Sequence, residues 1–310
     1  MTDENGRGAD MELSALDALK IETGGGEPPL RIGLEIALDM APGRDPAQTG
    51  ALAQAVDRFV ARFGAGLAWG DPSEGGRPVP LTDAVKTGLG DWIRGGDPSS
   101  PQVLHLFGGE AGLPPHPLHL RLFRDADWMP DGACRLILGI PVSALEALPP
   151  GAFLEEVCTL TADLSPISGG AGLALLADPQ TYGLAEVQPV LIAALRRFPG
   201  LDFNPSVLHG LTGGVKRVNW LTVLTAEEAA QLPAALPAPL VLHRCGAGGV
   251  LQAGPAPQLG DAEAGLRPEP YHVAGKLLAP MRDQGIKSVF RAISGGDAAA
   301  LSQEWLAAFD

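Results

Sequence analysis

Two stretches of the chain show the same succession of segments: strand, helix, strand, helix. In the first, residues 30–40 form an alternating, aliphatic run typical of a strand, and residues 46–63 place apolar side chains at helical spacing. A short strand at 64–69 and a helix at 81–93 are predicted next. The second stretch repeats this order, with strands at 135–142 and 170–177 and helices at 153–160 and 185–198. This alternation predicts helices packed on sheets.

Short matching segments indicate an internal duplication. Residues 64–68 and 170–174 have the same sequence, GAGLA, and an Asp-Pro pair follows each of them. Residues 101–105, PQVLH, are matched by 205–209, PSVLH, at nearly the same separation. Because the order and the separation are both kept, we predict two pseudo-repeats, at approximately 28–130 and 131–310.

Further strands are predicted beyond each repeat. They lie at residues 118–124 and 215–224, and in a pair formed by 240–244 and 250–253. The Gly-rich link 246–249 suits a hairpin, because glycine adopts the positive φ that tight turns need. We therefore expect an α+β fold of two related βαβα-containing halves. Its sheets should be mixed or antiparallel, with hairpins, and not a doubly wound parallel sheet.

The first 27 residues differ from the rest in composition. They are polar and acidic, with three glycines at 24–26, and only residues 11–21 have a weak amphipathic helix pattern. We expect residues 1–27 to be a loose tail and residues 28–310 to form the folded domain.

The charge balance limits the classes of partner. Acidic residues outnumber basic ones by 36 to 22, which gives a formal net charge of -14. Such a chain repels phosphate backbones, so direct binding of nucleic acid is disfavoured, whereas a basic partner is attracted and oriented. The alternative reading is that the excess acid only keeps the protein soluble.

Cysteine content and the N-terminus indicate a reducing compartment. The three cysteines, Cys134, Cys158 and Cys245, include no CxxC pair, so structural disulfides are not expected. The first ten residues have neither the basic start nor the apolar core of a secretory signal, and no run is long enough to span a bilayer. We therefore expect a cytoplasmic protein that does not bind membranes.

The sequence contains no recognised catalytic, phosphate-binding or zinc-protease motif. Prolines surround His116 and His119 and prevent a helical ligand pair, and His243 with Cys245 lacks a third metal ligand. Asp125 and Asp127 form a D-x-D pair of the kind that is usually solvated, and His105 and His209 occupy matching positions in the two repeats. We expect no cofactor, no metal and no enzymatic activity.

The last third of the chain carries four recognisable pieces. They are Val218-Asn-Trp-Leu-Thr222 inside the predicted strand 215–224, Pro257-Gln-Leu-Gly-Asp261, Tyr271, and Leu277-Leu-Ala-Pro280. In this order they resemble the immunity proteins of type VI secretion systems, a TsiV-like family. The pattern departs from that family after Asp261, where Ala262-Glu-Ala-Gly265 replaces an Asn-rich link.

The resemblance implies a binding protein. Members of the family protect the producing cell from a type VI toxin by occluding its active site, and the toxin is expected to carry a VRR-NUC nuclease domain with a basic DNA-binding cleft. Two alternatives remain open: a small-molecule enzyme with a site between the repeats, or an adaptor of the secretion machinery. No oligomeric state is predicted.

Two sets of residues follow from these arguments. The family residues are expected to build the fold, with Trp220 in the core: Asn219, Trp220, Leu221, Thr222, Pro257, Gly260, Asp261, Tyr271 and Pro280. Local acidic density gives the candidates for binding a basic toxin: Asp125, Asp127, Asp131, Glu155, Glu156, Glu227, Glu228, Asp261 and Glu263.

Overall fold

A computed structural model describes most of the chain. The described residues are 13–23, 27–71, 78–109, 114–129, 132–149, 151–208, 210–291 and 296–310. Asp131 and His209, which the sequence singled out, lie outside them. No helix in this part of the chain is both long and apolar enough to cross a membrane.

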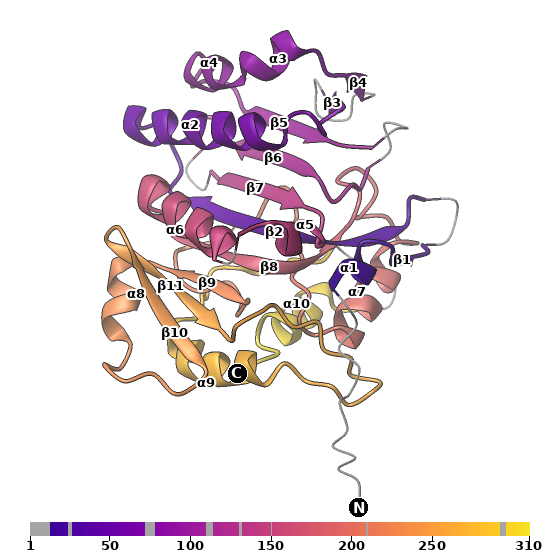
Figure 1. The fold of residues 1–310 in the computed structure, drawn as a ribbon, viewed down its shortest axis with the longest axis vertical. Helices are drawn as coiled ribbons and strands as arrows, with labels where there is room; N and C mark the ends of the chain where they lie inside the picture. Colours follow the sequence, from indigo (N-terminus) through magenta and orange to yellow (C-terminus); the bar gives the residue numbers. More distant parts are fainter. Residues whose placement is uncertain are drawn as a thin grey trace, which may run out of the picture.

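The described part of the chain folds around one large sheet (Figure 1). Its eleven strands are ordered β10-β11-β9-β8-β2-β7-β6-β5-β3-β4, with β1 paired to β2, and all of these pairings are antiparallel. The strands are β1 (Lys20–Ile21), β2 (Leu30–Met40), β3 (Trp69–Asp71), β4 (Val79–Pro80), β5 (Gln102–Phe107), β6 (His119–Arg124), β7 (Cys134–Ile140), β8 (Ser168–Leu176), β9 (Leu221–Leu224), β10 (Leu240–Cys245) and β11 (Gly248–Ala253).

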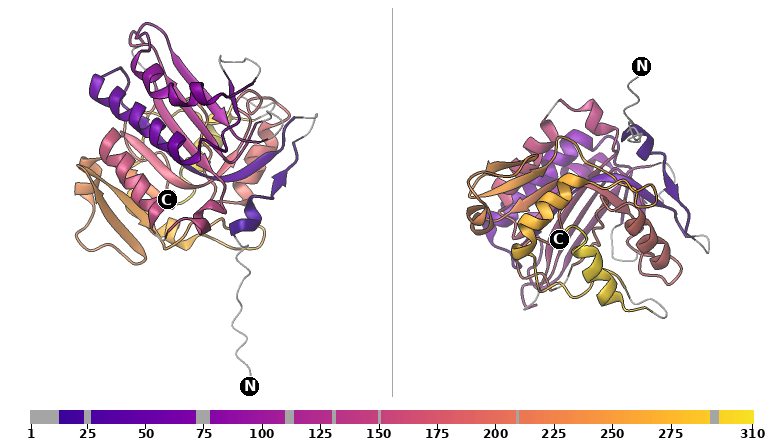
Figure 2. Two further views of the ribbon diagram at one scale, coloured as in Figure 1. Left: turned by 45° about the horizontal axis from the view of Figure 1, so that its top comes forward. Right: turned by 90° about the horizontal axis from the view of Figure 1, so that it is seen from below.

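Helices lie on both faces of the sheet. Figure 2 shows α2 and α6 side by side on one face, with α3 and α4 beyond α2, while α7 and α10 lie on the other face. The helices are α1 (Leu13–Leu16), α2 (Pro46–Phe63), α3 (Asp83–Thr87), α4 (Leu89–Arg94), α5 (Ala144–Ala147), α6 (Ala152–Leu164), α7 (Gln188–Arg197), α8 (Ala226–Gln231), α9 (Glu269–Leu278) and α10 (Ala298–Leu306), with a 3-10 turn η1 (Ala279–Met281) after α9.

Local sequence signals explain where several helices begin. Asp45 caps α2 by accepting a hydrogen bond from the Gln48 backbone N–H, and Pro46 occupies the first turn, where a missing N–H costs nothing. Thr225 and Glu228 form a capping box at the start of α8. The predicted helix at 46–63 is thereby confirmed, and so is a strand that leads into a short helix at Thr225.

Three predicted elements differ most from the observed ones. The helix expected at 81–93 is two helices, because Gly88 ends α3 and begins α4. The strand expected at 64–69 starts only at Trp69, because residues 64–66 form a turn after α2. The strand expected at 215–224 starts only at Leu221, where pairing with β8 and β11 begins. Before it, Lys216 bonds to Asp202, and Arg217 bonds to the backbone carbonyls of Leu201 and Pro199.

The expectation of two related sheets is wrong, because the strands join one sheet, and the duplication is not shown. β2 and β7 are neighbours at its centre, and each leads into a helix on the same face. The next strands, however, occupy different places: β8 pairs with β2, whereas β3 pairs with β5 and β4 near an edge. The segment 205–208 is not a strand, although residues 102–104 of its counterpart 101–104 lie in β5. The α+β class with antiparallel pairing and a β10–β11 hairpin is confirmed.

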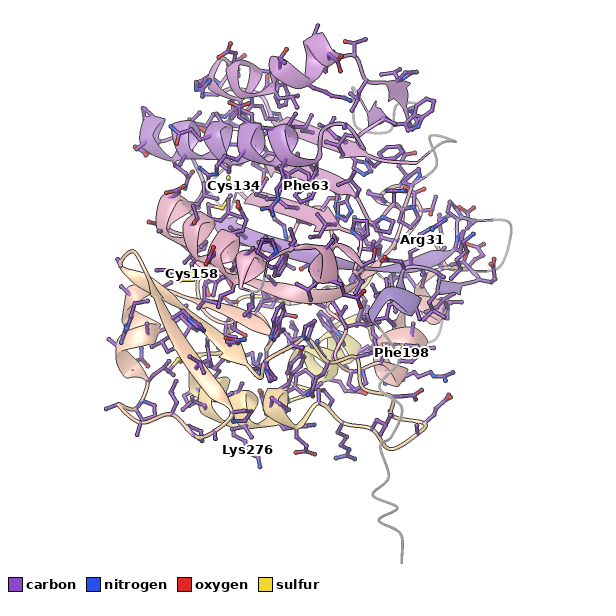
Figure 3. The ribbon with its side chains drawn as sticks, viewed as in Figure 1. Arg31, Phe63, Cys134, Cys158, Phe198 and Lys276 are labelled. Atoms are coloured by element: carbon purple, nitrogen blue, oxygen red, sulfur yellow. A yellow bond between two sulfur atoms is a disulfide. The ribbon has the colours of Figure 1, made fainter. Side chains whose placement is uncertain are left out.

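Two further expectations need correction. Residues 13–23 are not a loose tail, because β1 pairs with β2 and the Asp17 carboxylate accepts hydrogen bonds from the backbone N–H groups of Val142 and Ser143. Cys158 on α6 and Cys245 on β10 form a disulfide, with their Cα atoms 5.1 Å apart (Figure 3). Cysteine count could not reveal that the α6–hairpin packing brings these two residues together. Cys134 is buried and free.

Trp220 lies in the core immediately before β9. It is 5% exposed, its ring stacks on Phe153 of α6 at a centroid distance of 5.8 Å, and its Nε1 donates to the Gly254 carbonyl at 3.0 Å. Replacing it with alanine removes these contacts and leaves a cavity between α6 and the β11 end. We predict that Trp220→Ala lowers the free energy of unfolding by about 3–5 kcal/mol. Denaturant unfolding measures the free energy of unfolding. An unchanged value would show that the Trp220 ring does not stabilise the core.

Candidate functional site

Two of the acidic candidates are buried and form hydrogen bonds within the fold. Asp125 is 8% exposed, and its carboxylate accepts a hydrogen bond from the Ala133 backbone N–H at 2.8 Å. Glu228 is 7% exposed and accepts hydrogen bonds from both the backbone and the hydroxyl of Thr225. Neither carboxylate is presented to a partner.

The other described candidates lie on separate elements. Asp127 follows β6, Glu155 and Glu156 lie in the first turns of α6, and Glu227 is in the first turn of α8. Asp261 and Glu263 come together because both pair with Arg197 of α7, at 3.2 and 3.1 Å. The acidic residues chosen by local density therefore do not converge on one place.

Asp127 lies beside a hollow that has charged residues of both signs around it. The hollow lies between the start of α2, the end of α4 and the 96–98 turn, and it is also lined by Arg44 and Arg94. Arg44 is 3.8 Å from Asp127 and only 7% exposed, while Arg94 pairs with Asp57 and Asp91. The solvent-facing carboxylates outnumber the cations, so this end of the sheet is acidic.

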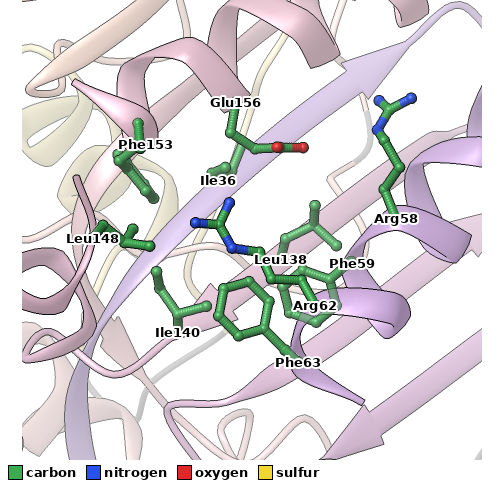
Figure 4. Close-up of a pocket in the computed structure, with 11 residues that line it drawn as sticks. Ile36, Arg58, Phe59, Arg62, Phe63, Leu138, Ile140, Leu148, Phe153 and Glu156 are labelled. Atoms are coloured by element: carbon green, nitrogen blue, oxygen red, sulfur yellow. The ribbon is translucent and has the colours of Figure 1, made fainter. Parts of the chain in front are cut away.

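A second surface is the groove between α2 and α6 (Figure 4). Its floor is apolar and includes Ile36, Leu138 and Ile140 of the sheet. At its rim lie two arginines of α2, Arg58 and Arg62, and one acid of α6, Glu156. Arg58 also bridges the two helices by an ion pair of 2.9 Å with Asp163. Such a groove can accept apolar side chains, but its lining offers no nucleophile.

The opposite face of the sheet holds a buried network of charges. Glu35 of β2 accepts hydrogen bonds from Arg121 of β6 and from Asn204, each at 2.8 Å, and lies 2.9 Å from His119 Nε2. Asn204 in turn accepts hydrogen bonds from Arg135 of β7 and from Lys216. The network thus ties the two central strands to the 202–219 segment.

The network continues through Asp202 to a family residue. Lys216 donates to both oxygens of Asp202, at 2.9 and 3.0 Å, and the Asn219 amide donates to the same carboxylate at 2.9 Å. Burial alone would raise the pKa of Asp202, but Lys216 and Arg217 lower it. The carboxylate therefore stays ionised and its charge is used within the fold.

This geometry does not suit a substrate site. Glu35 is 2% exposed, Arg135 1% and Lys216 7%, and each is occupied by another protein group. Of the histidines that the sequence raised, His243 contacts Gln252, and its possible partner Cys245 is in the disulfide. Within the described ranges, no group of three or more His, Cys, Asp or Glu side chains could hold a metal ion.

The sequence model of one protein family covers most of the chain. This family, TsiV, is described as type VI immunity for VRR-NUC, and it matches residues 51–309. The chain belongs to the TsiV family. The resemblance seen in the last third is thereby confirmed, and the TsiV match extends it through both halves of the sheet, from α2 to beyond α10.

A solved structure shares the TsiV fold seen here. It is the Pseudomonas aeruginosa T6SS protein PA0821, which matches with a TM-score of 0.76 and 24% identity over 96% of this chain and 90% of that chain. At this identity the likeness establishes the fold. No curated protein matches the sequence.

Most of the residues that carried the sequence resemblance are buried in the fold. Tyr271 of α9 is fully buried, and its hydroxyl accepts a hydrogen bond from the Gln258 backbone N–H at 3.1 Å. Gly260 has a φ of +68°, a conformation that favours glycine. The remaining members are Asn219, Trp220, Leu221, Thr222 and Pro257, all buried, the half-exposed Asp261, and Pro280, which lies exposed in η1.

Sequence reasoning missed the charged network and the acidic surroundings of Asp127. A signal for the network was present: Glu35 and Asp39 interrupt an otherwise apolar strand, and Arg135, Lys216 and Arg217 lie in similar runs. The hollow near Asp127 had no comparable signal, because its residues come from three separate segments.

Glu35 should contribute stability that depends on pH. Burial alone would raise its pKa, but Arg121 and His119 lower it below the usual 4.5. A lowered pKa means stability that is present above 4.5 and lost as the pH falls through the folded-state value. We predict that Glu35→Gln lowers the free energy of unfolding by about 3–5 kcal/mol at pH 7, because Arg121 loses its counter-charge.

Denaturant unfolding at several pH values checks this prediction. The difference in unfolding free energy between wild type and Glu35→Gln should narrow as the pH falls below 4.5. It should be smallest below the folded-state pKa of Glu35, where the wild-type carboxyl is also neutral. Glu155→Gln, at an exposed position on α6, is the matched control and should change little. A constant gap across the pH range would contradict the ionised state of Glu35.

Proposed function

We propose that this protein binds a VRR-NUC nuclease toxin of a type VI secretion system and blocks the toxin's active site by occlusion, in the cytoplasm of the cell that makes it. The observation that carries the proposal is the TsiV match over residues 51–309. The mechanism is steric and electrostatic: the protein occupies the place that DNA would take, and it carries out no chemistry on the toxin.

The charge of the chain supports this mechanism. A cleft that binds DNA must be basic, and a net charge of -14 lets the protein meet it with complementary potential. The same charge opposes direct binding of the inhibitor to DNA. Complementary fields raise association rates to as much as roughly 10⁸–10⁹ M⁻¹s⁻¹ at low salt, which suits an inhibitor that must capture a toxin before it cuts.

Co-expression tests the proposal directly. The toxin to test is a VRR-NUC protein whose gene lies beside this one in the source genome, and its expression alone should stop growth and degrade DNA. Expression of both proteins should restore growth, and the two should co-purify as a complex. A toxin variant with an inactivated nuclease site should be harmless alone and still bind. Continued killing despite abundant folded inhibitor would overturn the proposal.

Association kinetics test the electrostatic part of the mechanism. The association rate with the nuclease domain should fall as ionic strength rises, because salt screens the attraction. A variant that changes the exposed residues Asp127, Glu155, Glu227 and Glu263 to lysine should associate more slowly and with less salt dependence. Its melting temperature should be nearly unchanged, because exposed charges contribute little to stability. If wild type shows no salt dependence, shape and apolar contacts carry recognition instead.

A further inference from the structure

Two tryptophans at the acidic end of the sheet are exposed. Trp128 is 71% exposed and Trp92 43%, whereas Trp220 and Trp305 are 5% and 6% exposed and Trp69 is half-buried. Large aromatic side chains left in water gain nothing for the fold, and tryptophan is enriched among the residues that dominate binding energy at protein interfaces. These two side chains therefore point to a partner.

Both tryptophans flank the same short segment, residues 95–101. Trp92 lies in α4 just before it, and its backbone carbonyl accepts a hydrogen bond from Gln102 just after it, at 3.0 Å. The Trp128 indole N–H donates to the Ser99 carbonyl at 3.1 Å, and the Asp127 backbone N–H donates to Pro98 at 2.9 Å. Trp128 is thus held in place before any partner arrives, which reduces the entropy lost on binding.

Two carboxylates lie near Trp128: Asp127 precedes it in the chain, and Asp97 accepts a hydrogen bond from Ser99, whose carbonyl accepts from the indole. Asp97 and Asp127 are exposed, and hydrogen bonds from Ser99 lower the pKa of Asp97, so that it is ionised at neutral pH. Arg44, the cation nearest to Asp127, is almost buried and also donates to the Ser100 carbonyl. We name the surface formed by Trp92, Asp97, Asp127 and Trp128 the Trp92–Trp128 surface.

We infer that the Trp92–Trp128 surface is the docking site for a basic face of the nuclease toxin, with a lysine or arginine of the toxin placed on the Trp128 ring and paired with Asp127 or Asp97. This inference rests on the proposed function. A cation over an indole face and a carboxylate beside it act on the same charged group, so the two attractions add.

The groove between α2 and α6 fits this partner less well. Its apolar floor is edged by Arg58 and Arg62, with Glu156 opposite. At the groove, the carboxylates of Asp163 and Glu156 balance the two arginines, so a basic face would meet no net attraction. At the Trp92–Trp128 surface, among the described residues, Asp97 and Asp127 outnumber the one cation beside them, the nearly buried Arg44. Charge complementarity therefore selects the end of the sheet near β5 and β6 over the helical groove.

Binding of purified variants to the nuclease domain tests the inference. Trp128→Ala and Trp92→Ala should each weaken the dissociation constant, with Trp128→Ala losing about 30-fold or more, the size typical of a dominant interface residue. Trp128→Phe should lose less, because a ring remains for the cation. Asp97→Lys should slow association.

Matched controls separate binding from folding. Leu184→Ala and Val241→Ala truncate exposed apolar side chains elsewhere, and both should bind as wild type does. Melting temperatures establish that each variant is folded. Trp92→Ala is the safer of the two truncations, because the hydrogen bond from Gln102 uses its backbone carbonyl.

The outcomes distinguish this inference from the proposed function. If wild type neither binds the toxin nor protects cells, the proposed function fails. If wild type binds while folded Trp92→Ala and Trp128→Ala bind equally well, the toxin docks elsewhere and only the surface assignment is overturned. Selective loss in the tryptophan variants, with the controls unaffected, supports the assignment.

Discussion

The buried carboxylate of Glu35 is the constraint on which the centre of the molecule depends. An ionised carboxylate inside a protein is very costly unless cations and hydrogen-bond donors surround it. Glu35 meets this condition by accepting hydrogen bonds from Arg121 on β6 and from Asn204, which lies in the 202–219 segment. Asn204 then requires Arg135 and Lys216, and Lys216 requires Asp202. One buried charge thereby fixes how the 202–219 segment lies across the strands.

This network and the surface near Trp128 divide the work of the molecule. Each side chain of the network bonds to at least one other, and all are nearly inaccessible, so they determine the fold and are unavailable to a partner. The polar groups near Trp128 are exposed, and the rings between them have little packing to lose. Mutations in the two regions should therefore separate stability from recognition, which is useful for a protein whose proposed role is to bind and not to react.

Periodicity predicted most of the elements but not their arrangement. Strands β2, β7 and β8, helices α2, α6 and α7, and the β10–β11 hairpin were evident because their apolar patterns are regular. The stretch 215–220 was misassigned because Val215, Val218 and Trp220 have strand propensity, while the buried charges of Lys216 and Arg217 hold the backbone by distant contacts. The duplication looked plausible because similar segments recur in order, yet pairing places β3 and β8 at different positions in the sheet.

The candidate site was less predictable than the fold. The sequence placed Asp127 among the acidic candidates but gave equal weight to Asp125 and Glu228, whose carboxylates bond to nearby backbone in a turn and in a helix cap. Local acidic density does not distinguish a carboxylate that meets solvent from one that caps a backbone. The family residues were informative for the opposite reason, since most of them are the buried parts of the fold.

The position of β2 in the sheet also determines how late in synthesis the fold can be completed. Its neighbours in the sheet, β7 and β8, are made long after it, and the Glu35–Asn204 hydrogen bond joins groups 169 residues apart in the chain. At roughly 5–20 residues per second, a ribosome needs on the order of ten seconds to make the intervening segment. Until then the Glu35 carboxylate lacks Asn204, and the central part of the sheet is incomplete. Under the proposed function, a cell meeting the toxin depends on inhibitor that is already folded, because chains still being synthesised give no protection.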